Sequence, residues 1–293
     1  SLTLLGGGGS DQFVLSNGVT LTGVVDGQAG YDTLDLSAYA TIRNVVLTGT
    51  GSVDGFSGTE NAISGSFTNI DQILGSSSAG GSLTGRNSDA TFELDGTNRY
   101  ISGNTLDFSD FGILHGGSAS DTFETTGNQI FELFGGSGND IFSFADEATL
   151  TGNIDGQTGM NSLDFSDYLT SRFIFLTGYS SQTGFTGNEF CINGVFTNIS
   201  HIAGGFEVDE LSGTNDTGVW TITPTGGSYI ANNRTLTFTS IETLAGSAGD
   251  DRFVFQDGAT LGGSIDGRAG NDTIDFSAYT SGVTADLRNG EIS

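Results

Sequence analysis

Short segments in which apolar and polar residues alternate recur along the whole chain, each directly after a Gly-rich turn. Alternation with a period of two is typical of a strand with one buried face. The apolar positions of these segments are Phe13/Leu15, Leu34/Leu36, Phe123, Phe142/Phe144, Leu163/Phe165, Phe253/Phe255 and Ile274/Phe276. No stretch sustains a helical period, because Gly interrupts every window. The pattern predicts an all-β chain whose phenylalanines face inward and stack in core ladders; an aromatic ligand-binding strip is the alternative.

Long internal repeats organise these segments. Residues 5–39, 134–168 and 245–279 share one sequence pattern, and FTNIDQILG at 67–75 corresponds to FTNISHIAG at 196–204. We place the long repeats at 4–133, 134–244 and 245–293, the last of them truncated. The first repeat carries an additional segment, 124–140, about one coil long, and a stack of equivalent coils tolerates such an insertion. We therefore expect one continuous repeat domain over 1–293.

A finer period lies inside each long repeat. Asp11 and Asp32 are 21 residues apart, as are Asp251 and Asp272, whereas Asp121 and Asp140 are 19 apart. One coil would then consist of strand, turn, strand and Gly–Asp turn in roughly 20 residues. The sequence predicts a single-start, right-handed parallel β-solenoid of the β-roll or β-helix type, with Phe over Phe and Asp over Asp in successive coils.

Composition and charge narrow the class of protein. The chain has 48 Gly but a single Pro, and its 22 Phe provide enough surface for a buried core, so neither collagen nor a disordered linker fits. The net charge is −27, from 35 acidic residues against 8 Arg. Such a chain repels phosphate, so we expect no nucleic-acid partner, and divalent cations are its natural counter-charge. Acidity that only keeps the surface soluble is the alternative.

The remaining features point away from the cytosol and the membrane interior. Cys191 is the single cysteine and lies between apolar neighbours, so we expect a buried, unreactive thiol. No apolar run approaches membrane-spanning length, so we expect no membrane insertion. The chain opens close to one repeat and stops inside another, without an initiator Met. We expect a window from a longer secreted or cell-surface protein.

The Gly-rich turns carry the candidate chemistry. Residues 135–142 fit the pattern G-G-x-G-x-D-x-U completely, where U is a large apolar residue. The turns at 246–253, 267–274 and 27–34 lack only the second Gly, 6–13 keeps its glycines and Asp11, 116–123 has Ala119 for a Gly, and 156–163 has Asn161 for the Asp.

At these residues the sequence resembles the RTX (haemolysin-type) calcium-binding β-roll repeats. The wider pattern is similar to the long repeats of giant bacterial surface and filamentous-haemagglutinin-like proteins. The resemblance implies Ca²⁺ held between successive coils by turn carbonyls and the sixth-position carboxylates. Carried over residue by residue, the metal ligands would be Asp11, Asp32, Asp121, Asp140, Asp251 and Asp272. Calcium takes six to eight oxygens, and Gly lets carbonyls approach closely.

Two departures from that family limit the expected ladder. RTX motifs repeat on both sides of the roll, whereas the opposite turns here lack the motif, so the ladder is one-sided. It is also interrupted between residues 33 and 115 and between 162 and 245. The best sites should be the pairs Asp121/Asp140 and Asp251/Asp272. The alternative role for each Asp is an Asx turn that bonds its own backbone.

The expected function is structural or adhesive rather than enzymatic: a calcium-stabilised rod or fibre segment that joins neighbouring repeats end to end and contacts surface glycans. His115, expected in a turn, and His201 belong to no catalytic motif, and acidic pairs such as Asp209-Glu210 are expected on solvated turns. The alternatives are a non-catalytic RTX-like module of a polysaccharide lyase or epimerase, or a carbohydrate-binding module. Ice binding is disfavoured because Thr-x-Thr pairs do not recur at one coil position.

Overall fold

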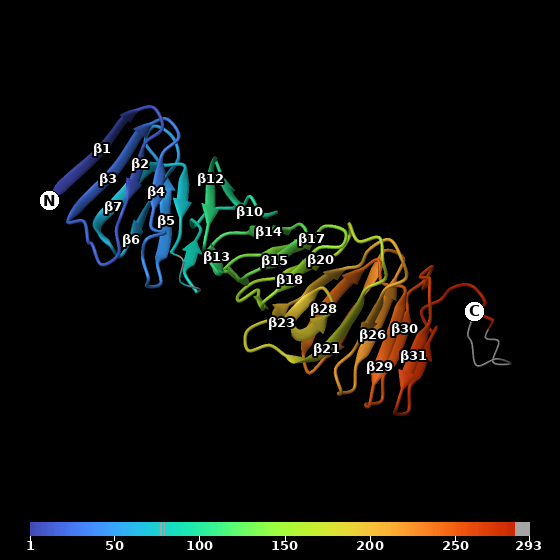
Figure 1. Cartoon of the computed structure of the whole chain (residues 1–293). Helices are drawn as coiled ribbons and strands as arrows, with labels where there is room; N and C mark the ends of the chain where they lie inside the picture. Colours follow the sequence, from blue (N-terminus) through green and yellow to red (C-terminus); the bar gives the residue numbers. More distant parts are fainter. Residues whose placement is uncertain (77, 79, 285–293) are drawn as a thin grey trace.

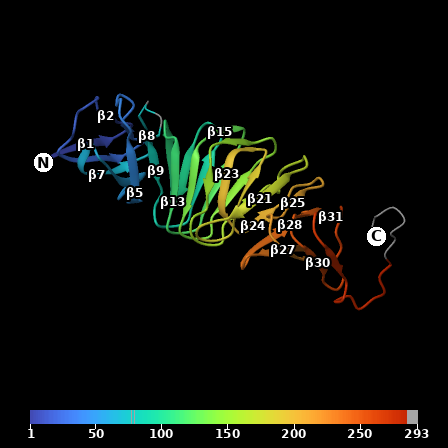
Figure 2. The same ribbon diagram turned by 90° about the horizontal axis from the view of Figure 1, so that it is seen from below.

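The structure, a computed structural model, describes residues 1–76, 78 and 80–284. All regular structure in these residues is β-strand, arranged in two large mixed sheets of 17 and 15 strands, here sheet A and sheet B. This part of the chain therefore offers no helix that could cross a membrane. The first strands and the last strands lie at opposite ends of an elongated molecule (Figures 1 and 2). The predicted all-β class is confirmed.

Sheet A follows the long axis of the molecule. Short strands β15 (Asn128–Ile130) and β18 (Thr149–Thr151) pair with each other beside the main row. The main row, in spatial order, is β1 (Leu2–Gly8), β3 (Gly23–Ala29), β7 (Ile63–Ile70), β6 (Phe56–Glu60), β5 (Asn44–Thr50), β9 (Ser82–Thr84), β13 (Ile113–Gly117), β16 (Glu132–Gly136), β19 (Ile154–Asp155), β23 (Ile192–Ile199), β22 (Phe185–Glu189), β21 (Phe173–Tyr179), β25 (Glu210–Ser212), β29 (Thr243–Ser247) and β31 (Ile265–Arg268).

Sheet B runs alongside with a matching row. Its spatial order is β2 (Gln12–Val14), β4 (Thr33–Asp35), β8 (Gln72–Leu74), β12 (Asn104–Ser109), β11 (Arg99–Ser102), β10 (Ala90–Leu94), β14 (Asp121–Thr125), β17 (Ile141–Phe144), β20 (Ser162–Asp164), β24 (His201–Ala203), β28 (Arg234–Thr239), β27 (Gly226–Ala231), β26 (Val219–Thr223), β30 (Arg252–Phe255) and β32 (Thr273–Asp275).

We call a strand of sheet A and the sheet B strand that directly follows it in the chain a rung. The rungs are β1–β2, β3–β4, β7–β8, β9–β10, β13–β14, β16–β17, β19–β20, β23–β24, β25–β26, β29–β30 and β31–β32. Neighbouring rungs pair in parallel, as in Phe123 opposite Phe142 and Gln12 opposite Thr33. The predicted stacking of equivalent residues is therefore present between rungs.

Exclusively parallel pairing, however, was a wrong expectation. The chain forms four antiparallel meanders, β5–β6–β7, β10–β11–β12, β21–β22–β23 and β26–β27–β28. After β4 the chain skips ahead in sheet A to β5, and β6 and β7 then fill the two places behind it. The same detour recurs after β20. Each sheet stays continuous, but inside each meander the three strands are stacked in the reverse of their chain order.

The core lies between the two sheets and combines aliphatic side chains with rows of stacked aromatic rings. The predicted inward positions Phe142, Phe144, Phe253 and Phe255 are all buried. Ring centroids are 5.0 Å apart for Phe123 and Phe142, and 4.9 Å apart for Phe255 and Phe276. The core-ladder interpretation of the phenylalanines is confirmed.

A buried ion pair holds each detour in sheet A. Glu189 at the end of β22 is buried, and its Oε1 lies 3.4 Å from Nε of Arg172. The guanidinium of Arg172 covers the ring of Tyr168 at 4.1 Å. Arg43, Glu60 and Tyr39 repeat this arrangement in the first half of the chain. We call each group a Tyr–Arg–Glu clamp.

Candidate metal centre

The candidate site is the row of turns along one edge of the molecule, where each rung passes from sheet A to sheet B. The sixth residue of the Gly-rich motif stands at the start of the sheet B strand, and parallel pairing stacks these residues above one another. The stacked acidic and amide residues form the aspartate ladder, which has three sections: Asp11, Asp32 and Asp71; Asp121, Asp140 and Asn161; Asp251 and Asp272.

In each pair, one carboxylate oxygen of the later aspartate accepts a hydrogen bond from the backbone of the preceding rung. Asp32 Oδ1 accepts a hydrogen bond from the Asp11 amide at 2.9 Å. Asp140 Oδ1 accepts from the Asp121 amide at 2.9 Å. Asp272 Oδ1 accepts from the amide of Asp251, also at 2.9 Å. The structure therefore brings the six predicted ligands together as three adjacent pairs.

The bonds also revise the proposed Asx role. In these pairs the side chain bonds the backbone of the neighbouring rung, so the aspartates link rungs to each other. Asp251 does both: Oδ1 accepts from the amide of Gly218 in the preceding rung at 2.8 Å, and Oδ2 accepts from the amide of Ser247 in its own turn at 2.9 Å.

The ladder extends one step further than the Gly-rich motif indicates. Asp71 Oδ2 accepts from the amide of Asp32 at 3.0 Å, although no Gly-rich turn precedes Asp71. Asn161 Oδ1 accepts from the amide of Asp140 at 2.9 Å, and Asn161 Nδ2 donates to the carbonyl of Asn198 at 3.1 Å. The sequence signal for this extension is the match between segments 67–75 and 196–204, because both follow ladder rungs.

The second carboxylate oxygen of several ladder residues has no hydrogen-bond donor. Oδ2 of Asp11, Asp32 and Asp140 and both carboxylate oxygens of Asp121 are buried without a partner. A buried acceptor without a donor costs about 1–3 kcal/mol, and more when it is charged. These oxygens are therefore positioned for a proton or a cation.

Burial also changes the acidity of the ladder. Removal from water, followed by the nearby Asp140 carboxylate, raises the pKa of Asp121 to about 7. Burial raises the pKa of Asp140 to about 6, against the bond from the Asp121 amide, which lowers it. Burial likewise raises the pKa of Asp32, Asp71 and Asp251. Two adjacent carboxylates in the middle section thus keep their protons to a higher pH than an exposed aspartate does.

The first glycine of each motif is required by close packing at the ladder. A Cβ on Gly135 would lie 2.2 Å from Asp140 Oδ2 and 2.8 Å from the carbonyl oxygen of Gly156 in the next rung. A Cβ on Gly116 would lie 2.4 Å from Asp121 Oδ2 and 2.3 Å from the Gly135 carbonyl oxygen. The orphaned carboxylate oxygen and a carbonyl of the following rung therefore converge beside each glycine.

The second motif position adopts a left-handed backbone in several turns, both with and without glycine. Gly136 has φ of 107°, and the replacements Gln157 and Arg268 have φ of 58° and 63°. Where Gln or Arg replaces this Gly, an Asp two residues earlier supports the turn: Asp155 accepts from the Gln157 amide and Asp266 from the Arg268 amide, both at 2.9 Å. Asp26 supports Gln28 in the same way.

The ladder fits calcium only with backbone help. Within residues 1–76, 78 and 80–284, no three His, Cys, Asp or Glu side chains converge to form a metal site. A Ca²⁺ ion would therefore take one or two carboxylates of the ladder and complete its six to eight oxygen ligands from turn carbonyls. The orphaned oxygens of Asp121 and Asp140 are the donor atoms best suited to it.

Other titratable groups have structural surroundings. His115 lies in β13 rather than in a turn, and its ring stacks on Phe134 at 4.7 Å. Asp209 was expected on a solvated turn but is fully buried. Its carboxylate accepts hydrogen bonds from the amides of Arg172 and Gly205, each at 2.5 Å, and these replace its contacts with water. Cys191 is buried as predicted, and burial raises the pKa of its thiol.

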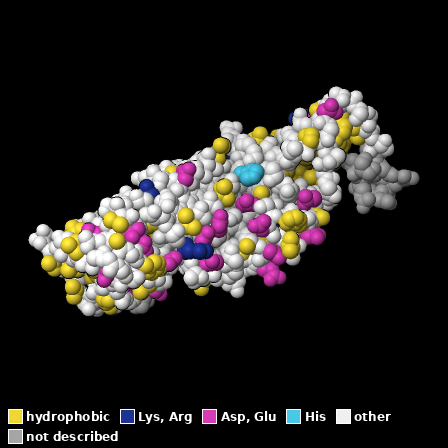
Figure 3. Space-filling view, turned by 90° about the horizontal axis from the view of Figure 1, so that it is seen from above, with side chains coloured by type: hydrophobic (Ala, Val, Ile, Leu, Met, Phe, Trp, Pro, Cys, Tyr) yellow, Lys and Arg dark blue, Asp and Glu magenta, His cyan; other side chains and the backbone are white. Residues whose placement is uncertain are grey.

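A polar hollow of about 520 Å³ lies beside β24 and β28, where His201 Nδ1 is 2.9 Å from Thr237 Oγ1. One face of the molecule carries many acidic and few basic side chains, spread along its length (Figure 3).

No protein-family model matches the chain, and no curated protein sequence matches it significantly.

Proposed function

We propose that the chain is a calcium-stabilised β-solenoid segment that serves as a rod or spacer in a secreted, adhesive surface protein. The orphaned carboxylate oxygens of the aspartate ladder carry this proposal, because they recur in its first two sections, at Asp11, Asp32, Asp121 and Asp140, and are placed to accept a positive charge. The net charge of −27 supports it, since stacked carboxylates repel each other without a cation.

The elongated stack of rungs supports the structural half of the proposal. Each added rung lengthens the molecule and needs no new site, as in repeat proteins in general. The ladder and the core repeat along this axis, whereas the two histidines lie apart from each other, His115 against Phe134 and His201 against Thr237. This arrangement favours a rod over the polysaccharide-lyase module that is the main alternative.

The calcium experiment is a comparison of the wild-type chain with Asp140→Asn. The natural Asn161 shows that an amide keeps the ladder bond through Oδ1 and donates from Nδ2 to a carbonyl of the next rung. The variant therefore keeps the hydrogen bonds and removes one charge and one metal ligand. We expect calcium to raise the melting temperature of the wild-type chain and to raise that of Asp140→Asn much less.

Isothermal titration supplies the direct measurement. Asp140→Ala should weaken calcium binding more than Asp11→Ala, because Asp140 has ladder neighbours on both sides and Asp11 has one. Calcium binding that is absent in the wild-type chain, or a melting temperature that a chelator leaves unchanged, would contradict the calcium proposal.

A further inference from the structure

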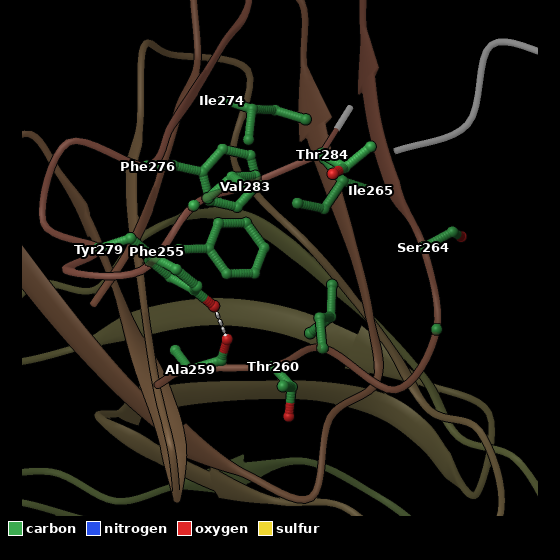
Figure 4. A pocket seen from close by; sticks show the side chains of 13 residues that line it. Phe255, Ala259, Thr260, Ser264, Ile265, Ile274, Phe276, Tyr279, Val283 and Thr284 are labelled. Carbon is green, nitrogen blue, oxygen red and sulfur yellow. Dashed lines mark hydrogen bonds between the residues drawn. The ribbon is translucent and has the colours of Figure 1, made fainter. Parts of the chain in front are cut away.

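The last rung, β31–β32, exposes the core. A cavity of about 710 Å³ opens there, and Figure 4 shows the apolar side chains that line it, among them Phe255, Ile265, Ile274 and Phe276. Tyr279 donates from its hydroxyl to the carbonyl of Ala259 at the same place. Among the described residues, β31 pairs only with β29 and β32 only with β30. This end therefore presents apolar side chains together with two strand edges that no described residue pairs.

Two rungs inside the molecule closely match the last rung in sequence. Residues 265–279 match 25–39 of rung β3–β4 and 154–168 of rung β19–β20. The equivalents of Ile265 and Ile274 in those rungs are Val25, Leu34, Ile154 and Leu163, and all four are fully buried. The same surface is thus covered twice within this molecule, and the cover can be identified.

The cover is the same two-stranded arc in both places. Rung β3–β4 is covered by β7–β8, and rung β19–β20 by β23–β24. Both arcs, 63–75 and 192–204, read I-x-G-x-F-T-N-I-x-x-I-x-G. Rung β1–β2 has the sequence type of β16–β17 and β29–β30, and neither of these follows a rung of the last type. An arc is therefore favoured over the first rung of a second copy.

Apolar and polar contacts define what the arc recognises. Phe196 pairs with Ile154 and Ile202 with Leu163. Asn198 Nδ2 donates to Asp155 Oδ1 at 2.6 Å. The first arc repeats this bond, from Asn69 to Asp26 at 2.7 Å.

The corresponding groups of the last rung are in place and uncovered. Ile265 and Ile274 are half-buried, and Asp266 is exposed. Its carboxylate already holds the Arg268 amide, as Asp155 holds the Gln157 amide while it also binds Asn198.

We propose that rung β31–β32 is a docking surface for a strand–turn–strand arc of the F-T-N-I-x-x-I type, which in both precedents begins 38 residues after the start of the matched rung segment, within the same long repeat. Phe of the arc covers Ile265, the last Ile covers Ile274, and Asn binds the carboxylate of Asp266. Strand edges bind an added strand through backbone hydrogen bonds, while the side-chain pockets give specificity. The inference rests on the proposed rod function, because it identifies the segment that covers the last rung of the rod.

The test uses the full chain and a fluorescein-labelled synthetic peptide of residues 192–204, followed by fluorescence polarisation. We expect saturable binding that unlabelled peptide 63–75 competes away. In the peptide, Asn198→Asp places a carboxylate opposite Asp266 and should weaken binding about tenfold or more. In the chain, Ile274→Asp should abolish binding, and Val14→Asp, at an exposed position near the opposite end, should leave it unchanged.

A charge exchange separates recognition from loss of folding. Asp266→Asn in the chain, combined with the Asn198→Asp peptide, restores a complementary amide–carboxylate pair and should recover most of the affinity. No binding at millimolar peptide, equal binding to the Ile274→Asp and Val14→Asp chains, or no recovery in the exchanged pair would overturn the proposal. Because binding is measured with and without calcium, failure of the calcium proposal leaves this result readable. Rods that form without peptide binding would refute the arc and leave the rod function standing.

Discussion

Ladder aspartates such as Asp32 and Asp140 divide their carboxylate between two roles. In Asp140, Oδ1 holds the amide of Asp121, and Oδ2 faces Gly135 without a donor. The first role is satisfied by Asp or Asn, as Asn161 shows. The second distinguishes them, because only a carboxylate places negative charge there. Hydrogen bonding alone would not favour Asp over Asn, yet most ladder positions hold Asp.

The raised pKa values of Asp121 and Asp140 predict an unusual pH dependence for the metal-free chain. A carboxyl whose pKa is higher in the folded state binds its proton more tightly there, so folding is favoured below the folded pKa and loses stability as pH rises towards it. The window runs from the unfolded value near 4 to the folded values of about 6 and 7. Each tenfold change in proton affinity of one group corresponds to about 1.4 kcal/mol.

Denaturant unfolding in a chelator should therefore show higher stability at pH 5 than at pH 8. Calcium should stabilise the chain more at pH 8, since protons no longer compete for the ladder oxygens. In Asp121→Asn the chelated protein should lose much of this pH dependence. A metal-free stability that increases steadily from pH 5 to pH 8 would contradict the raised pKa values.

Phe253 tests the packing of the core ladder. Its ring stacks on Trp220 at 5.8 Å between centroids, and the side chain is fully buried. Phe253→Ala should lower the free energy of unfolding by about 3–5 kcal/mol, because a narrow core between two sheets cannot collapse around the cavity. Phe206→Ala, at a ring that is 74% exposed, is the control and should change stability by less than about 0.5 kcal/mol.

At the scale of elements, the meanders explain the gaps in the ladder. The Asp motif is absent where the chain makes its detours through β5–β7, β10–β12, β21–β23 and β26–β28, because strands inside a meander are joined by hairpin turns instead of Gly–Asp turns. Asn232 and Asn233, between β27 and β28, have φ of 46° and 57°. Two consecutive left-handed residues are typical of a tight hairpin.

The Tyr–Arg–Glu clamp predicts a large effect of one arginine. Arg172→Ala would leave the buried carboxylate of Glu189 without a counter-charge, and removal of one partner of a buried pair costs about 3–5 kcal/mol. The matched control is Arg99→Ala, whose ion pair with Glu93 is far more exposed and should contribute less than about 1 kcal/mol.

Urea unfolding of both variants measures the difference. The double variant Arg172→Met/Glu189→Gln should recover part of the loss, because it removes both buried charges. An effect of Arg172→Ala no larger than that of Arg99→Ala would show that the clamp does not hold the detour.

At the scale of the whole molecule, no described residue pairs with the outer strand edges of the last rung, and the first rung has exposed Leu2 and Leu5. Electron microscopy of an assembly containing this segment should therefore show rods whose axis follows the stacking direction of the strands. The physical reason is that free strand edges accept further strands only along that axis. Discrete globular particles, or a groove lined with converging carboxylates, would favour the enzyme or lectin alternative.

The sequence by itself determined the β-class, the inward phenylalanines and the stacked aspartates. Alternation at Phe142/Phe144 fixes which face is buried, and a constant spacing such as that of Asp251 and Asp272 brings like residues to neighbouring rungs. Both are local properties, repeated often enough that a single interpretation satisfies all copies.

Only the tertiary structure decided the order of the strands inside the meanders and the acidity of the ladder. Alternation has the same period in parallel and antiparallel strands, so the detours after β4 and β20 could not be distinguished from successive coils. The raised pKa of Asp121 requires burial beside Asp140, and the Asp71 extension arises from a segment 39 residues further along the chain than its partner Asp32. Charge, burial and neighbouring strands come together at such a site only when distant segments pack against one another.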